Sequence, residues 1–263
     1  MNERVSSTVL TVVIGTSVLT GCASSKRGLE LHDYWPSGER WKHAASRALK
    51  DRGTWIPLAG AAVVSVDDWD REISDWAVEN TPVFGSGENA RQASDTFWIA
   101  TQLSMAGTAL AVPDGNGPWQ RKPERLLLEE FSVLLTAGTT SAIKSLADRE
   151  RPDASNDRSF PSGHASQSFT MARMACLNVD DLPGLSRGWR LTFKTTFTTF
   201  AAAAAWSRVE GGKHYPSDVL IGAALGNFVA VFVHDAFLPV DSMVRFHASL
   251  GRTELSFSVG LTF

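Results

Sequence analysis

The hydrophobic positions of this chain recur with the period of a helix over most of its length. Polar turns separate the periodic stretches, and the densest turn-forming cluster lies at residues 113–118. The pattern predicts an all-α fold, a helical bundle. Its helices are expected at residues 39–50, 55–77 with a break near 67–68, 90–112, 124–146, 164–177, 189–206 and 217–237.

The C-terminal tail has a different pattern. From Leu255 to Phe263 apolar and polar residues alternate, which is the period of a strand. Residues 243–249 are a candidate partner strand, with a turn through Gly251. We expect a short C-terminal β-hairpin within residues 239–263. A single hairpin cannot close a barrel in lipid, so the hairpin packs on the bundle or touches another protein, and its partner and role are unknown.

The first 21 residues look like a targeting segment rather than part of the fold. An uncharged apolar segment follows Arg4 and leads to Leu19-Thr20-Gly21-Cys22. This order resembles a bacterial lipoprotein signal, which implies that residues 1–21 are removed and that Cys22 carries lipid. Ala23-Ser24 lacks the aspartate that retains such proteins in the inner membrane, so the resemblance implies the periplasmic face of the outer membrane. A short spanning anchor and a buried helix with an accidental cysteine are the alternatives.

Composition narrows the classes further. The chain has 263 residues, of which 43% are hydrophobic, enough for a substantial core. The net charge of −3 argues against a nucleic-acid surface, and two cysteines are too few for a disulfide framework. Later charge-free stretches such as 96–112 are shorter than a membrane span, so we expect lipid attachment alone. The expected order is a tether and N-terminal helix at 22–53, the bundle at 54–238, and the tail.

Three separated motifs contain the chemistry-bearing residues. The first is Lys144 followed after six residues by Arg151-Pro152, and the second is Pro161-Ser162-Gly163-His164. The third is Ser207-Arg208, five residues, His214, three residues and Asp218. Any one of them has an ordinary explanation: a solvated helix face, a turn, or a core histidine. Together they resemble the signature of the type 2 phosphatidic acid phosphatase superfamily, which includes bacterial acid phosphatases, lipid phosphatases and vanadium haloperoxidases, and whose helical bundle we expect here.

The residue types suit a phosphoryl group. Lys144 and Arg151 are two helical turns apart, which would place them near one face. Pro152 turns the chain out of the helix, so we expect Arg151 to reach forward from the helix end or from the loop after it. Free N–H groups where a helix opens after Ser162-Gly163 form an anion site, and Arg208 adds a planar fork of donors. We therefore predict phosphate-binding roles for Lys144, Arg151, Ser162, Gly163 and Arg208.

The resemblance assigns the catalytic roles. It makes His214 the nucleophile that forms a phosphohistidine, and His164 the acid that protonates the leaving oxygen. Asp218, four residues after His214, can hold one ring nitrogen and orient the other. The fixed cations neutralise the phosphoryl oxygens, so no metal or other cofactor is expected, and vanadate is expected to inhibit.

The predicted function is hydrolysis of a phosphomonoester or pyrophosphate, on a phosphorylated lipid or a small phosphate ester. Lipid attachment favours a lipid substrate without excluding soluble esters. A vanadate-dependent haloperoxidase would use the same pocket, but the chain is short for that group. A non-catalytic envelope lipoprotein is the third alternative, against which the intact His164, His214 and Asp218 argue.

Overall fold

A computed structural model describes residues 36–113, 122–238, 244–250 and 255–261. Contacts divide the chain into two units, Met1–Asp33 and Tyr34–Phe263, and every described residue belongs to the second. Cys22 and the proposed signal segment lie outside the described residues, so lipid attachment stays a prediction.

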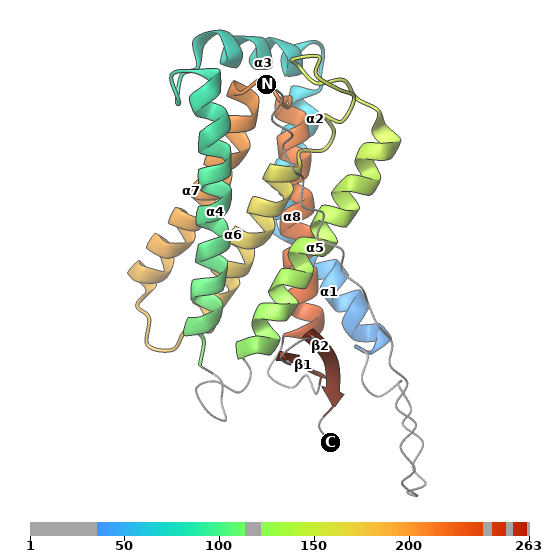
Figure 1. The fold of residues 1–263 in the computed structure, drawn as a ribbon, viewed down its shortest axis with the longest axis vertical. Coiled ribbons are helices and arrows are strands. Elements are labelled where there is room, and N and C mark those ends of the chain that lie inside the picture. The colour runs from blue at the N-terminus through green and yellow to red at the C-terminus, as the bar shows by residue number, and fades with distance from the viewer. Residues whose placement is uncertain (1–35, 114–121, 239–243, 251–254, 262–263) are drawn as a thin grey trace, which may run out of the picture. The chain divides into compact units, whose positions relative to one another are not determined.

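Each predicted helical segment is present (Figure 1). The expected break near residues 67–68 divides one segment into α2 and α3, and Asp67 there has a positive φ of 52°. The helices are α1 (Gly38–Lys50), α2 (Arg52–Val64), α3 (Trp69–Asn80), α4 (Gly87–Ala111), α5 (Lys122–Ala147), α6 (Gly163–Asp181), α7 (Arg187–Glu210) and α8 (Pro216–Phe237).

Short polar side chains fix where many of these helices begin. A side-chain oxygen accepts a hydrogen bond from a first-turn backbone N–H at Ser37, Asp51, Ser86, Ser162 and Ser186. Such a cap stabilises a helix by about 1 kcal/mol because it satisfies a donor that has no partner within the helix. The caps therefore set the exact start of α6, which matters for the site described below.

Helices α6 and α8 form the centre of the bundle. They pack against each other, and α1, α2, α4, α5 and α7 surround the pair (Figure 1). The main apolar cluster draws side chains from α4, α5, α6 and α8, among them Met105, Leu128, Met171, Met174 and Val233. Helix α1 packs on α8, so it belongs to the same compact unit as the rest of the bundle.

Two glycines allow α8 to lie directly against α6. A Cβ atom added to Gly222 would be 2.7 Å from the carbonyl oxygen of Ser162, and one added to Gly226 would be 2.1 Å from that of Ser166. Any larger residue would force the two helices apart. Gly222 thus holds the N-terminus of α8 beside that of α6.

Beyond α8 the chain forms two strands. Strand β1 (Val244–Leu250) pairs with β2 (Leu255–Leu261) in antiparallel register, with Val244 opposite Leu261 and Leu250 opposite Leu255. The connecting residues 251–254 are not among the described ones. The partner and role of this segment stay predictions.

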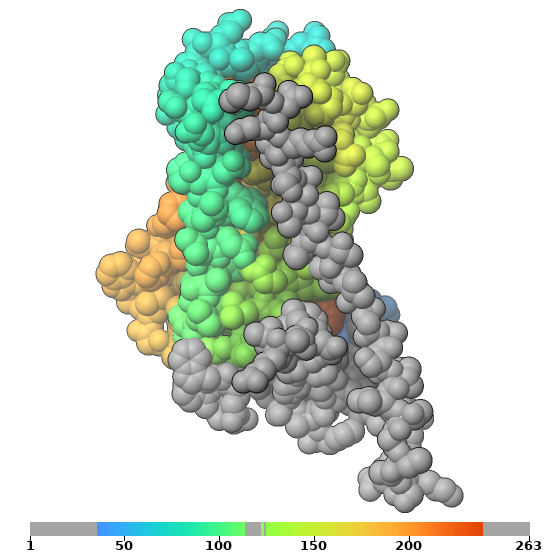
Figure 2. All heavy atoms as spheres, in the orientation of Figure 1, coloured from blue at the N-terminus to red at the C-terminus, as the bar shows by residue number. Residues whose placement is uncertain are grey.

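Among the described residues, two helices are long and apolar enough to cross a membrane by length and composition. They are Arg125–Ala147 and Pro216–Phe237. The second is mostly buried, as expected of a core helix, but only 33% of the first's most apolar window is buried. Large apolar side chains are also exposed on α4 and α5, and both helices reach the face drawn in Figure 2. The examples are Ile99, Leu103, Phe131 and Leu134.

Candidate active site

The three motifs meet where the α5–α6 loop, the start of α6 and the α7–α8 connection come together. His164 lies in the first turn of α6, and Arg208 lies in the last turn of α7. His214 lies between α7 and α8, and Asp218 in the first turn of α8. These four residues therefore come from four segments that the fold gathers at one end of the bundle.

His214 is the more buried of the two motif histidines, with a relative exposure of 2%. Its backbone N–H donates to the carbonyl oxygen of Arg208, which ties the connection to the end of α7. Burial, with the nearby charges of Lys144 and Arg208, lowers the pKa of His214 to about 4. The imidazole is therefore neutral at pH 7, the state that a nucleophilic nitrogen requires.

Asp218 faces His214 as the four-residue spacing predicts. The Oδ2 atom of Asp218 lies 3.8 Å from Nδ1 of His214, which is longer than a hydrogen bond, and Nδ1 has no other partner in the described part of the chain. Catalytic hydrogen bonds are often long in a ligand-free site and shorten when the substrate binds. The geometry is thus compatible with the orienting role without completing it.

The carboxylate of Asp218 is fully buried and well satisfied. It accepts hydrogen bonds from the Ser159 hydroxyl at 2.5 Å, the Tyr215 backbone N–H at 2.9 Å and Arg149 at 2.7 Å. Burial works against its ionisation, but these bonds and the charge of Arg149 hold the pKa of Asp218 below its ordinary value. A fixed negative charge therefore stands behind His214.

The cations of the motifs surround the same space. Burial lowers the pKa of Lys144 to about 8, and the charges of Arg151 and Arg208 add to the effect. Burial and the charge of Arg151 likewise lower the pKa of Arg208. The buried Nε atoms of Arg151 and Arg208 have no hydrogen-bond partner within the described residues. Unpaired donors among crowded positive charges are what an oxyanion would satisfy.

The helical period does not explain how Lys144 and Arg151 meet. Helix α5 ends at Ala147, Asp148 follows with a positive φ of 46°, and Arg151 lies in the loop. Pro152 disfavours helical backbone at its predecessor, so the helix could not continue through Arg151. Lys144 donates instead to the carbonyl oxygen of Arg158 at 2.6 Å, which folds the loop back over the end of α5.

The start of α6 has the expected form, one residue earlier than predicted. Ser162 caps the helix by accepting from the backbone N–H of Ala165 at 3.4 Å, so its hydroxyl oxygen already has a structural use. A Cβ added to Gly163 would meet only Thr140, at 4.0 Å. The side of Gly163 is therefore open, as close approach of an anion to the backbone requires.

His164 is more accessible than His214, since 38% of its side chain is exposed. Burial and the charge of Arg208 lower the pKa of His164, against the effect of a neighbouring aspartate, Asp95. The Nε2 atom of the ring lies 3.0 Å from Oδ1 of Asp95. Solvent therefore reaches the site from the side of His164.

Comparison with known proteins agrees with the motifs. Residues 126–239 match the model of the PAP2 superfamily, and this range contains all three motifs. The resemblance to the PAP2 superfamily is confirmed. A lipid A 1-phosphatase from Porphyromonas gingivalis is 30% identical over 179 residues, 66% of this chain and 36% of the relative. The match thus spans about a third of that relative's length.

A solved structure is also similar. The crystal structure of a transmembrane PAP2-type phosphatidylglycerolphosphate phosphatase from Bacillus subtilis is 22% identical, with a TM-score of 0.48. The alignment covers 73% of this chain and 94% of that chain.

Arg149 and Asp70, which lie next to the motif residues, were not predicted from the sequence. Arg149 joins Asp218 to Asp70, with 2.7 Å contacts to both carboxylates, and its guanidinium lies over the ring of Tyr215. Asp70 also accepts from the backbone N–H of Ser217. Arg149 stands beside the first motif but outside its pattern, and Asp70 lies far away on α3, so no local signal marked either.

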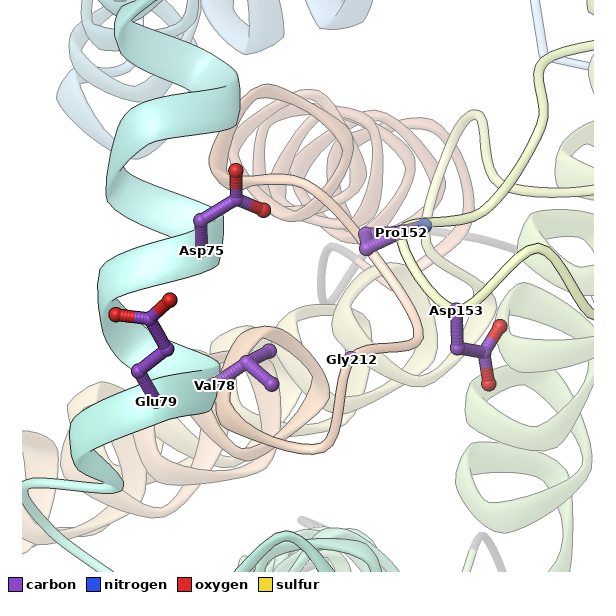
Figure 3. Close-up of a pocket in the computed structure, with 6 residues that line it drawn as sticks. All are labelled: Asp75, Val78, Glu79, Pro152, Asp153 and Gly212. Carbon is purple, nitrogen blue, oxygen red and sulfur yellow. The ribbon is translucent and has the colours of Figure 1, made fainter.

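A small cavity adjoins the candidate site without being lined by its cations. It has a volume of about 180 Å³ and lies between α3 and the two loops of the motifs (Figure 3). Its lining residues are Asp75, Val78, Glu79, Pro152, Asp153 and Gly212. Three carboxylates and no cation line it, so it would repel a phosphate.

Proposed function

We propose that this protein is a phosphatase that hydrolyses a lipid phosphate ester or pyrophosphate through a phosphohistidine intermediate. The observation that carries the proposal is that the buried, neutral His214 and the partly exposed His164 both lie near Arg208, whose Nε donor has no partner among the described residues. The similarity to a lipid A 1-phosphatase favours a phosphorylated lipid as the substrate.

In the first step the cations hold the phosphoryl oxygens while the lone pair of His214 attacks phosphorus. The bond from phosphorus to the leaving oxygen breaks as the new N–P bond forms. His164, in its protonated form, gives its proton to the leaving oxygen. Asp218 stabilises the positive charge that develops on the ring of His214.

In the second step water replaces the lipid alcohol. The neutral His164 left by the first step takes a proton from this water, which attacks phosphorus and breaks the N–P bond. Phosphate leaves, and both histidines return to their starting protonation states. Each histidine thus acts twice, which requires that they face the same phosphorus from opposite sides.

The proposal includes no metal and no other cofactor, because Lys144, Arg151 and Arg208 supply the positive charge that a metal would otherwise provide. Vanadate has the charge and shape of phosphate and is expected to occupy the same donors. We therefore propose it as an inhibitor.

The experiment is a phosphate-release assay on the purified full-length protein with phosphatidate, lipid A, a prenyl diphosphate and an aryl phosphate. Wild-type protein releases phosphate from at least one lipid, vanadate inhibits it, and the His214→Ala variant is inactive. Undiminished turnover by that variant would refute the mechanism. Halide oxidation that depends on added vanadate would favour a haloperoxidase instead.

We also propose attachment to the periplasmic face of the outer membrane through lipid on Cys22. The exposed apolar side chains of α4 and α5 are a second source of membrane affinity. Fractionation of the Cys22→Ser variant separates the two: release into the soluble fraction supports the lipid anchor, whereas unchanged membrane partition assigns attachment to the helices.

A further inference from the structure

Asp95 contacts a catalytic imidazole although it belongs to none of the three motifs. It lies on α4, outside the range that matches the PAP2 superfamily, and its Oδ1 atom is 3.0 Å from Nε2 of His164. The side chain of Asp95 is 72% exposed, so burial does not force it into this contact. The interaction is therefore a specific one between two otherwise accessible groups.

The other charges with the largest effect on His164 among the described residues are positive. Arg208 on α7 and Arg151 in the α5–α6 loop both oppose protonation of its ring, as does burial. Asp95 is the acidic group that acts in the opposite direction, by its charge and its hydrogen bond. A leaving-group acid must be protonated before it reacts, but the cations that bind phosphate disfavour the protonated form of His164. A carboxylate that accepts a hydrogen bond from its ring favours that form.

The frame around Asp95 keeps it in place. Glu210, at the end of α7, accepts hydrogen bonds from the backbone N–H groups of Val83 and Phe84 just before α4, both at 3.0 Å. Two residues after Asp95, the ring of Phe97 packs on Phe200 of α7 at 5.9 Å between centroids. Helix α4 is thus fixed to α7, the helix that carries Arg208.

We propose that Asp95 is the positioning residue of the leaving-group acid. By accepting a hydrogen bond from Nε2 of His164, it fixes the tautomer, favours the imidazolium and turns Nδ1 toward the leaving oxygen. When the P–O bond breaks, the proton on Nδ1 moves to that oxygen. The neutral ring keeps the proton on Nε2, which still donates a hydrogen bond to Asp95. This inference rests on the proposed function. In it Asp95 orients His164 as Asp218 orients His214.

Two substitutions separate the charge of Asp95 from its hydrogen bond. Asp95→Asn keeps an acceptor without the charge, and we expect the alkaline limb of the pH profile of kcat/KM to move to lower pH by about one unit. Asp95→Ala removes both, so kcat for alkyl phosphates should fall about tenfold or more. Activated aryl phosphates should be less affected, because their leaving oxygen needs little protonation.

Asp75→Asn is the matched control, since it removes the same charge near the same end of the bundle without touching His164. Its profile should superimpose on that of the wild type. If the Asp95→Asn profile superimposes too, while His214→Ala is inactive as expected, the role of Asp95 is refuted and the proposed function stands.

A second measurement does not depend on activity. In protein labelled with ¹⁵N at histidine, the ring signals of His164 are assigned by their loss in His164→Gln and followed against pH. The titration midpoint of His164 should fall in Asp95→Asn and stay in place in Asp75→Asn. An unchanged midpoint in Asp95→Asn would contradict the proposal even if no substrate had been found.

Discussion

Two histidines with little exposed surface lie at opposite ends of α8, and their pKa values shift in opposite directions. His214 precedes the first turn of the helix and His234 lies in its last turn. Burial lowers the pKa of His214 to about 4, with help from Lys144 and Arg208. Burial acts on His234 in the same direction, but Asp181 and Asp235 outweigh it and raise the pKa of His234.

The difference shows that the neighbours, rather than burial, decide the sign. Cations from other elements surround the first ring, and carboxylates surround the second. The helix dipole works in the same direction, since its positive end lies near His214 and its negative end near His234. A neutral ring near cations suits attack on phosphorus, whereas the carboxylates beside His234 favour the charged form of its ring.

The carboxylates at the two ends differ in the same way. Asp218 is satisfied by three donors. Glu129 on α5, toward the end of the bundle that holds His234, is fully buried with neither oxygen in a hydrogen bond among the described residues. Burial accordingly raises the pKa of Glu129 to about 7. The first carboxylate is held charged by its donors, whereas burial favours the protonated form of the second.

The largest expected contrast is in activity. His214→Ala removes the nucleophile and should lower kcat by about 10⁴-fold or more. His234→Gln changes a ring far from the reacting atoms and should leave kcat within about threefold. Steady-state assays on one substrate compare them, and similar losses in both variants would remove the functional distinction between the two ends.

The pH dependence of activity sharpens the assignment. Attack needs a neutral His214, so activity should fall below about pH 4, and protonation of the leaving group needs a charged His164, whose pKa lies below 6.5. The profile of kcat/KM should therefore be a bell with an acidic optimum, falling about tenfold per pH unit on its alkaline side. An optimum above pH 7 would contradict the lowered pKa values of the two rings.

The pH dependence of stability should come from the end of the bundle that holds His234 and Glu129. The pKa of Glu129 is about 7 when folded, against a reference value of 4.5. The stability that its protonated form contributes is fully present below pH 4.5 and is lost as pH rises through 7, a loss of about 3 kcal/mol. Glu129→Gln should abolish this dependence in denaturant unfolding at pH 5 and pH 8. Glu130→Gln is the matched control, and identical pH dependence in wild type and Glu129→Gln would contradict the assignment.

The smallest expected effect concerns the packing that joins the two ends. Gly226→Ala places a Cβ atom against the Ser166 carbonyl and should cost about 1–3 kcal/mol of unfolding free energy. Gly107→Ala, where nothing lies within 4 Å, should instead stabilise α4 by about 0.5–1 kcal/mol. Thermal unfolding measures both, and equal effects would show that α6 and α8 are not in close contact.

The sequence alone determined the helices and the motif residues. Apolar periodicity marked every helical segment because each helix buries one face, and the motif spacings identified His164, His214 and Asp218 as functional candidates. One position was left open by the sequence: Pro152 allows Arg151 to lie at a helix end or in the loop after it, and the structure places it in the loop because α5 ends at Ala147.

The tertiary structure decided which partners these residues have. Asp95 reaches His164 from 69 residues away, Asp70 reaches Arg149 from 79 residues away, and neither pair has a period or motif that could reveal it. Protonation states follow the same rule, since the charges that set them come from other helices. Local pattern encodes which side chains are available, whereas electrostatic state depends on distances that exist only after the helices pack.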